Sequence, residues 1–312
     1  MIEKVLVATD FSKDAEKIVE CAGEIPGIKE VVLLNVVWKD QLARSWSPGD
    51  DLAKSKAEIE GPIKKLEGMG LKVKARVEAS QEAPEYKVID RIANEENADL
   101  VIVGARGKSR FRTWVLGSVS TNVLRYGTRN LLIMRYKVVE SGEIEKICPT
   151  LFSNVLCPVD FSEVGMGAIN QLRDLGLATS VHLLSVIAKG ETAEEVEARM
   201  KDAEKKLDAV KNELLSKVKI NVTSEVVSAK GGYRTYGAGG LASTKGTAML
   251  EVKGIDEIII SKAEEMNASL IALSSGGKGY LDELDSGIGS VAFDVGRKAT
   301  RPVLIVRARK KA

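Results

Sequence analysis

The sequence predicts an α/β protein of two tandem domains, each built on a doubly wound parallel sheet. Short β-branched apolar runs alternate with amphipathic helical stretches, which is typical of parallel β-α-β units with right-handed crossovers. The segment LVATDFS at 6–12 recurs as LCPVDFS at 156–162. A chain of 312 residues also has the length of two domains of about 150 residues each.

The alternation assigns the elements of the first copy in order. The expected strands are Val5–Val7, Glu30–Val37, Lys72–Val77, Leu100–Val103 and Leu131–Met134. The expected helices are Lys13–Ala22, Leu52–Gly68, Tyr86–Asn97 and Val119–Tyr126. Doubly wound sheets bind ligands beyond the carboxyl ends of their strands, where the strand order reverses. Asp10 and Gly104, which directly follow strand ends, are therefore the first candidates for a binding site.

The repeat also sets the domain boundaries. The offset between the copies is 150 residues at their start, 170 where 96–102 matches 266–272, and 172 at the end. We predict a first domain at 1–138, a linker with some extended structure at 139–153, and a second domain at 154–312. The extra residues of the second copy form a glycine-rich insertion at about 230–254, which indicates a long loop or a hairpin. A functional lid and an embellishment without function both remain open.

Composition excludes several classes of partner. The net charge of +2 gives no overall field for nucleic acid or membrane, and 4% aromatic residues provide few stacking surfaces for single strands. No apolar run is long enough to span a bilayer and no signal peptide opens the chain, so a cytoplasmic protein is expected. Cys21, Cys148 and Cys157 lack the paired spacing of a zinc site. The single histidine, His182, lies in a predicted strand, and the matching position in the first copy is Val32. A position that is valine in one copy favours packing over catalysis.

A glycine-rich loop is the strongest functional motif. Gly104-Ala-Arg-Gly107 follows an apolar run, and Gly117-Ser118 comes after nine further residues. Gly104 allows a sharp turn and Gly107 a positive φ, while Gly117 and Ser118 open a helix whose unpaired N–H groups favour phosphate. Ser118 suits a helix N-cap or a phosphate contact. The loop has no acidic residue and four basic ones: Arg106, Lys108, Arg110 and Arg112. It predicts an anion site, although similar glycine turns occur in proteins that bind nothing.

These residues resemble the universal stress protein family in its tandem form. The resemblance rests on the openings Thr9-Asp10-Phe11-Ser12 and Val159-Asp160-Phe161-Ser162 and on the Gly-x2-Gly-x9-Gly-Ser frame. It implies five-stranded parallel sheets of the adenine nucleotide alpha hydrolase class, with strand order 3-2-1-4-5. It also implies that the last strands pair across a dimer-like interface, which the two repeats would supply internally. A further homodimer remains open.

The resemblance also implies positions for an adenine nucleotide. Asp10 would accept a hydrogen bond from adenine, Val36 would line the base and ribose, and the glycine frame would hold the phosphates. A carboxylate repels phosphate, which agrees with Asp10 at the base end; its alternative role is to cap the helix that starts near Ser12. Ala8 departs from the proline that is frequent in the family. The expected nucleotide-binding residues are Ala8, Asp10, Val36, Gly104, Arg106, Gly107, Lys108, Gly117, Ser118, Val119 and Ser120.

The second copy departs further from the pattern. Aligning the strand ends places Ser274 at the position of Gly104 and Gly277 at that of Gly107, whereas a frame starting at Gly276 restores the spacing. The loop 274–290 has a net charge of −2, against +4 for 104–118. Opposite signs beside a polyphosphate predict that the first domain binds better. The weaker candidates in the second domain are Pro158, Asp160, Val186, Gly277, Gly289 and Ser290.

The expected function is that of an ATP-binding regulatory protein of the stress response. ATP, ADP and AMP are all candidate ligands, and Mg²⁺ would be carried by the phosphates rather than by a carboxylate cluster. No general base, nucleophile or metal site accompanies the loop, so at most slow ATP hydrolysis is expected. One alternative is an adenylating ATP pyrophosphatase of the same superfamily, because the loop from Ser274 to Gly279 superficially resembles its phosphate loop. The other is an interaction scaffold without nucleotide.

Overall fold

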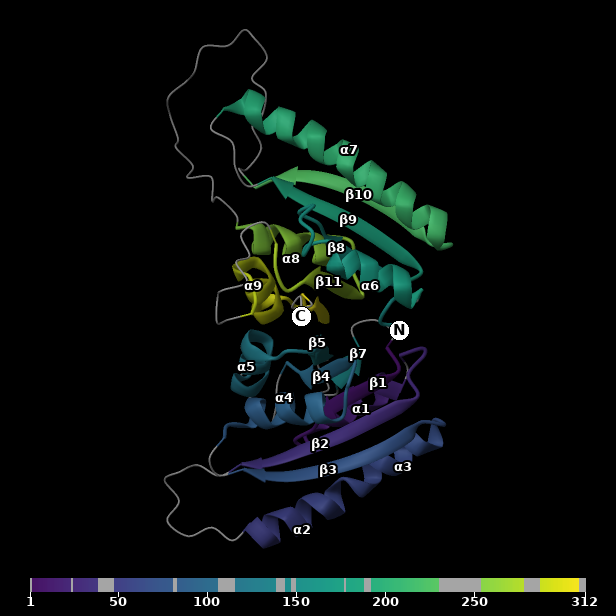
Figure 1. Cartoon of the computed structure of the whole chain (residues 1–312), viewed down its shortest axis with the longest axis vertical. Coiled ribbons are helices and arrows are strands. Elements are labelled where there is room, and N and C mark those ends of the chain that lie inside the picture. The colour runs from purple at the N-terminus through teal and green to yellow at the C-terminus, as the bar shows by residue number, and fades with distance from the viewer. Residues whose placement is uncertain are drawn as a thin grey trace.

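The two copies join into one sheet. A computed structural model describes residues 2–23, 25–38, 48–80, 83–105, 116–138, 144–146, 150–176, 178–187, 192–229, 254–277 and 287–308. Ten strands form one sheet in the order β10-β9-β8-β11-β12-β5-β4-β1-β2-β3. Each half therefore has the order 3-2-1-4-5, and the prediction of two doubly wound α/β domains is confirmed (Figure 1).

The elements follow the predicted alternation. The first half contains β1 (Lys4–Ala8), α1 (Lys13–Gly23), β2 (Glu30–Trp38), α2 (Pro48–Glu58), α3 (Glu60–Gly68), β3 (Lys72–Ser80), α4 (Glu85–Glu95), β4 (Leu100–Gly104), α5 (Ser118–Tyr126) and β5 (Asn130–Met134). A short antiparallel pair, β6 (Tyr136–Val138) and β7 (Ile144–Lys146), follows. The second half contains β8 (Asn154–Pro158), α6 (Gly167–Leu175), β9 (Ser180–Ile187), α7 (Ala193–Lys217), β10 (Asn221–Ser228), α8 (Ile255–Glu265), β11 (Leu270–Ser274), α9 (Ser290–Lys298) and β12 (Val303–Val306).

One helix prediction was wrong in detail. The stretch expected as a single helix over 52–68 consists of α2 and α3, which meet at Ile59. Pro62 explains the break, because proline has no N–H to donate to the carbonyl four residues earlier in the chain. The glycine-rich insertion, apart from residue 254, and Cys148 lie outside the described residues.

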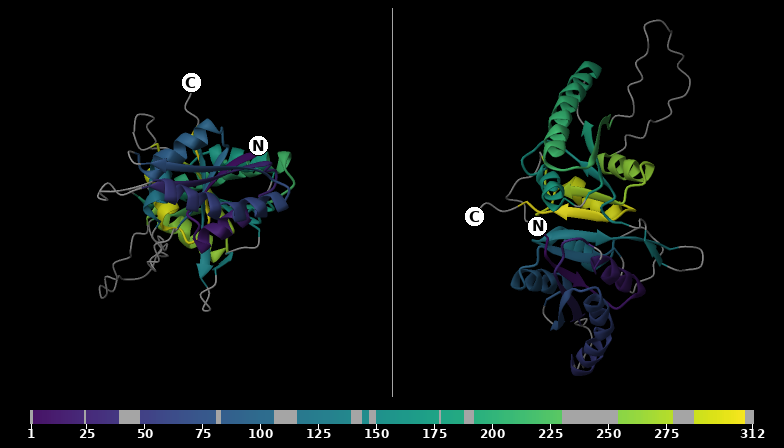
Figure 2. Two further views of the ribbon diagram at one scale, coloured as in Figure 1. Left: turned by 90° about the horizontal axis from the view of Figure 1, so that it is seen from below. Right: turned by 90° about the vertical axis from the view of Figure 1, so that its right-hand side faces the viewer.

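The halves meet at antiparallel strands β5 and β12. Val303 pairs with Ile133, Leu304 with Leu132, and Ile305 with Leu131. Leu132 and Leu304 occupy the same position in the two copies, so a pseudo-twofold axis passes between them. Figure 2 shows these two strands in the middle of the elongated molecule, with one half on either side.

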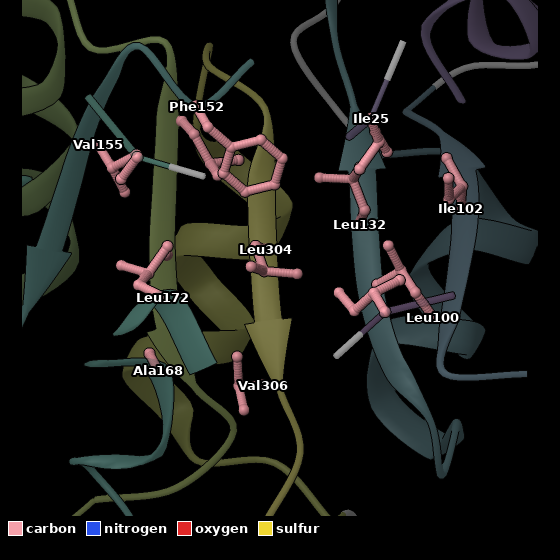
Figure 3. Packing of buried hydrophobic residues seen from close by; sticks show 14 of the residues in the cluster. Ile25, Leu100, Ile102, Leu132, Phe152, Val155, Ala168, Leu172, Leu304 and Val306 are labelled. Carbon is pink, nitrogen blue, oxygen red and sulfur yellow. The ribbon is translucent and has the colours of Figure 1, made fainter. Parts of the chain in front are cut away.

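The hydrophobic core continues across this join on both faces of the sheet. On one face, α1, α3, α6 and α7 contribute buried residues to a single cluster, and on the other face α4, α5, α8 and α9 do so. Leu132 of the first half and Leu304 of the second are both 1% exposed and belong to the first cluster (Figure 3). Burial of this kind is the main favourable term in folding, so the two halves share their stability.

Candidate functional site

The candidate residues of the first domain gather at one edge of the sheet. β1 pairs in parallel with β2 on one side and with β4 on the other. In this register, Asp10 follows β1, Val36 lies near the end of β2, and Gly104 ends β4. From β1 the chain continues to β2 and β3 on one side of β1, and then crosses to β4 on the other side. The strand order therefore reverses at β1, and sheets of this kind bind ligands at such a point.

Side chains hold the turn after β1 by three successive hydrogen bonds. Thr9 Oγ1 accepts from the Phe11 N–H at 3.1 Å, Asp10 Oδ1 from the Ser12 N–H at 3.0 Å, and Ser12 Oγ from the Ala15 N–H at 3.2 Å. Ser12 therefore caps α1, the role considered for Asp10. Phe11 has φ of 58°, a left-handed conformation that is uncommon for a bulky residue. The turn is thus constrained in a way that fixes the Asp10 backbone.

Two buried polar residues at this edge were not predicted. Thr9 and Asn35 are 8% and 7% exposed, and Asn35 Nδ2 donates to the Thr9 carbonyl at 2.8 Å. Asn35 thereby ties the end of β2 to the end of β1. The signal in the sequence was an amide inside the apolar run Leu33-Leu34-Asn35-Val36, matched by a serine at 185 in the second copy.

The start of α5 presents free donors at the same edge. The Gly117 N–H donates to the Ala105 carbonyl at 2.9 Å, and the first helical bond runs from Thr121 to Gly117 at 2.8 Å. The backbone N–H groups of Ser118, Val119 and Ser120 have no acceptor in the described part of the chain. Together with the helix dipole, such groups favour an anion.

The two serines of α5 have different environments. Gly117 is the N-cap, so Ser118 is the first helical residue and its side chain is exposed. Ser120 is buried, and its hydroxyl donates to the Gly104 carbonyl at 2.6 Å. Its proton is therefore engaged in joining α5 to β4. The predicted residues Arg106, Gly107 and Lys108 lie outside the described residues.

The second domain repeats the edge with different contacts. Asp160 Oδ1 accepts from both the N–H and the hydroxyl of Ser162, at 3.0 and 2.7 Å. A side chain on Gly165 or on Gly277 would collide with the Asp160 carboxylate, so this carboxylate lies in a notch between the two glycines. The first domain has Ala15 at the position of Gly165, so it carries a methyl group where the second domain has none.

Ser274 makes contacts in the second domain that a glycine, which has no side chain, cannot make in the first. Gly104 pairs with Met134 and Ser274 with Val306, which are matching positions, so Ser274 is the counterpart of Gly104. Its buried hydroxyl accepts from the Ala168 N–H at 2.9 Å and donates to the Gly165 carbonyl at 3.0 Å. These bonds replace helical ones, which explains why α6 begins only at Gly167.

The remaining candidates of the second domain keep the positions of their counterparts. Pro158 ends β8 and Val186 lies near the end of β9, both partly buried. Gly289 is the N-cap of α9, and its N–H donates to the Ser275 carbonyl at 2.6 Å. Ser290 opens the helix with an exposed side chain, as Ser118 does in α5.

Comparison with known proteins identifies the family. The profile of the universal stress protein family matches residues 1–135 and again residues 151–307. The chain belongs to the universal stress protein family. A universal stress protein of Methanocaldococcus jannaschii is 29% identical over 160 residues, covering 44% of this chain and 97% of the relative.

Solved universal stress proteins extend the likeness. One from Archaeoglobus fulgidus covers 97% of this chain and 96% of its own, with 23% identity and a TM-score of 0.64, so the two share their fold over almost their entire lengths. A universal stress protein in complex with cAMP is 24% identical, covers 43% of this chain and 97% of its own, and has a TM-score of 0.34. The tandem form predicted from the sequence is confirmed.

Three further properties of the described residues of this universal stress protein bear on its function: metal binding, membrane spanning and thiol reactivity. It contains no group of three or more His, Cys, Asp or Glu residues arranged to hold a metal ion. Within the same residues, no helix combines the length and apolarity needed to cross a membrane. Cys21 and Cys157 are buried thiols, and burial raises the pKa of Cys157 to about 12. At neutral pH Cys157 is therefore protonated and unreactive.

His182 lies in β9, as predicted, and packs against β10 and α8. Its Nδ1 is 2.7 Å from Thr223 Oγ1, and its Nε2 is 3.5 Å from Glu225 Oε2. Burial lowers the pKa of His182 below the ordinary value of 6.5; Lys262 acts in the same direction and Glu225 against it. The folded state therefore favours the neutral imidazole.

This environment predicts a pH dependence of stability. Because the folded pKa of His182 is depressed, the unfolded chain binds the proton first as the pH falls below about 7. We expect the urea midpoint to decrease between pH 7.5 and pH 5.5, and to decrease less in His182→Gln. The carboxylates with lowered pKa, such as Glu225, lose their contribution only below this window. Equal pH dependence in both proteins would contradict the assignment.

Proposed function

We propose that this protein is a cytoplasmic regulator of the stress response whose first domain, 1–138, binds an adenine nucleotide. The observation that carries the proposal is the meeting of Asp10, Gly104 and the free N–H groups of α5 at the point where the strand order reverses. The Asp10 carboxylate suits an exocyclic amine, and the start of α5 suits phosphate. One edge thus offers both halves of a nucleotide site.

The basic loop 104–118 supplies the charge for a polyphosphate. Its net charge is +4 in sequence, so we expect ATP to bind more tightly than AMP. Mg²⁺ would be carried by the bound phosphates, in the way that this ion usually meets nucleotides. We propose that nucleotide binding acts as a signal; within the described residues, no group of three or more His, Cys, Asp or Glu is arranged to hold a metal ion.

We infer that the second domain binds nucleotide more weakly. Three features support this inference. Ser274 bonds to Gly165 and Ala168 where the first domain has a glycine, Asp160 lies in its own glycine notch, and the loop 274–290 carries a net charge of −2. A ligand at this edge would compete with internal contacts and would meet a repulsive charge.

The test uses two matched alanine variants. Among the described residues, a Cβ on Gly117 would meet only the Ala105 carbonyl oxygen at 3.6 Å, and a Cβ on Gly289 only the Ser275 carbonyl oxygen at 3.5 Å and the Gly276 α-carbon at 3.8 Å. All three distances are ordinary contacts, and neither glycine has a positive φ. Both variants should therefore fold normally, while the methyl group at 117 occupies the space that a phosphate needs.

Isothermal titration with ATP, AMP and cAMP measures the outcome. Gly117→Ala is expected to weaken ATP binding at least tenfold, about 1.4 kcal/mol, while Gly289→Ala leaves the tight site unchanged. Equal effects of the two variants would refute the preference for the first domain. Failure of the unmodified protein to bind any of these nucleotides would refute the proposed function itself.

A further inference from the structure

The pseudo-twofold axis passes between two unlike residues in the helix layer. Helices α5 and α9 pack against each other above strands β5 and β12. Leu132 pairs directly with Leu304, and the offset of 172 that relates these two also relates Leu124 to Gly296. In a symmetric dimer of identical domains, residues that meet at the axis would be identical. Here a leucine meets a glycine.

The contact between these two residues is close. A Cβ on Gly296 would lie 2.8 Å from Leu124 Cδ2 and 3.0 Å from Cδ1, so the leucine side chain occupies the space that any larger residue would need. Leu124 is 0% exposed. Gly296 lies inside α9, where glycine is unfavourable by roughly 0.5–1 kcal/mol relative to alanine. Its backbone does not require glycine, because its φ is not positive. The packing of Leu124 explains its presence.

A second unlike pair lies on the same helices. Phe293 of α9 corresponds to Thr121 of α5. The guanidinium of Arg125, in the first domain, lies over the Phe293 ring at 4.5 Å from its centroid, a distance suited to a cation–π interaction. Two first domains would have no aromatic ring at this position.

We propose that the Leu124–Gly296 pair makes the first domain select the second domain as its partner. Two first domains would place Leu124 against Leu124, and overpacking of a filled core is destabilising. Two second domains would place glycine against glycine and leave a cavity, which is destabilising too. The interface therefore fits the neighbouring domain of this chain rather than a like domain of a second copy. This inference does not depend on nucleotide binding.

Single substitutions reproduce both like pairs within the whole chain. Gly296→Leu creates the leucine–leucine contact of two first domains, and Leu124→Gly creates the glycine–glycine contact of two second domains. The double variant, Leu124→Gly with Gly296→Leu, exchanges the two residues. The double variant has as many helical glycines as the unmodified chain. Helix propensity therefore favours neither the double variant nor the unmodified chain.

Thermal unfolding of the full-length variants tests the proposal. Gly296→Leu is expected to lower Tm by about 5 °C or more, although removing a helical glycine alone would raise Tm. Leu124→Gly is expected to lower Tm as well, and the double variant to lose less than the sum of the two. If Gly296→Leu does not fold, the same cycle is measured with alanine at both positions. A Tm for Gly296→Leu at or above that of the unmodified chain, or strictly additive losses, would overturn the proposal.

Discussion

Replacing Arg135 by methionine is expected to lower the free energy of unfolding by about 2–4 kcal/mol, because it breaks charged hydrogen bonds in a buried position. Arg135 follows β5 and is 7% exposed. Its Nη2 donates to the carbonyls of Gly296 and Arg297 at 2.8 and 3.1 Å, at the end of α9 in the other domain. The variant would leave these carbonyls without the donor that also complements the negative end of the helix dipole.

The pseudo-symmetric residue provides a matched comparison. Arg307 Nη2 donates to the Val123 and Leu124 carbonyls of α5 at 3.1 and 2.6 Å, so each domain caps a helix of the other. Urea unfolding followed by circular dichroism should show a similar loss for Arg307→Met, and a smaller loss for Arg135→Lys, which keeps the charge. Losses below about 0.5 kcal/mol, the range of ordinary surface substitutions, would show that these bonds contribute little.

The second large effect is expected for Leu132→Ala, which should lower the free energy of unfolding by about 3 kcal/mol through lost burial and a cavity. Leu132 is 1% exposed and pairs with Leu304 across the join of the two halves. Leu304→Ala should lower the free energy of unfolding by about the same amount. The loss in the double variant should differ from the sum of the two single losses, because the two residues pair directly with each other.

An exposed leucine is the control for this prediction. Leu215 lies on α7 and is 45% exposed, so Leu215→Ala should change the free energy of unfolding by less than about 0.5 kcal/mol. Denaturant midpoints and slopes are compared for all four variants. If Leu132→Ala and Leu215→Ala have equal effects, the join is not part of the cooperative core.

Sequence reasoning succeeded where the signal was local or repeated. The strands of the first half were found from short apolar runs, and the positions of Asp10 and Gly104 at strand ends followed from them. The strand order came from the family resemblance and was confirmed. The break between α2 and α3 could have been predicted from Pro62, a residue that ends helices for a known steric reason.

Contacts between distant segments could not be predicted in this way. Ser274 bonds to residues more than a hundred positions earlier in the chain, and no periodicity in the sequence relates them. Arg135 and Arg307 each follow a strand, and in the sequence they are typical of exposed charges. Only the structure shows that each contacts a helix of the other domain. The contact between Leu124 and Gly296 could be predicted only if the position of the pseudo-twofold axis were known. The offset of 172 residues between the two copies does not give that position. The candidate nucleotide residues remain predictions for binding experiments.

The antiparallel pairing of β5 with β12 also determines how the protein responds to dilution. In a dimer of separate subunits, an interface of this kind dissociates as the protein concentration falls, and the melting temperature falls with it. Here both strands belong to one chain, so each faces its partner at an effective concentration that does not depend on the concentration of the protein. The joined sheet should therefore persist at any cellular abundance, down to a few molecules in a cell.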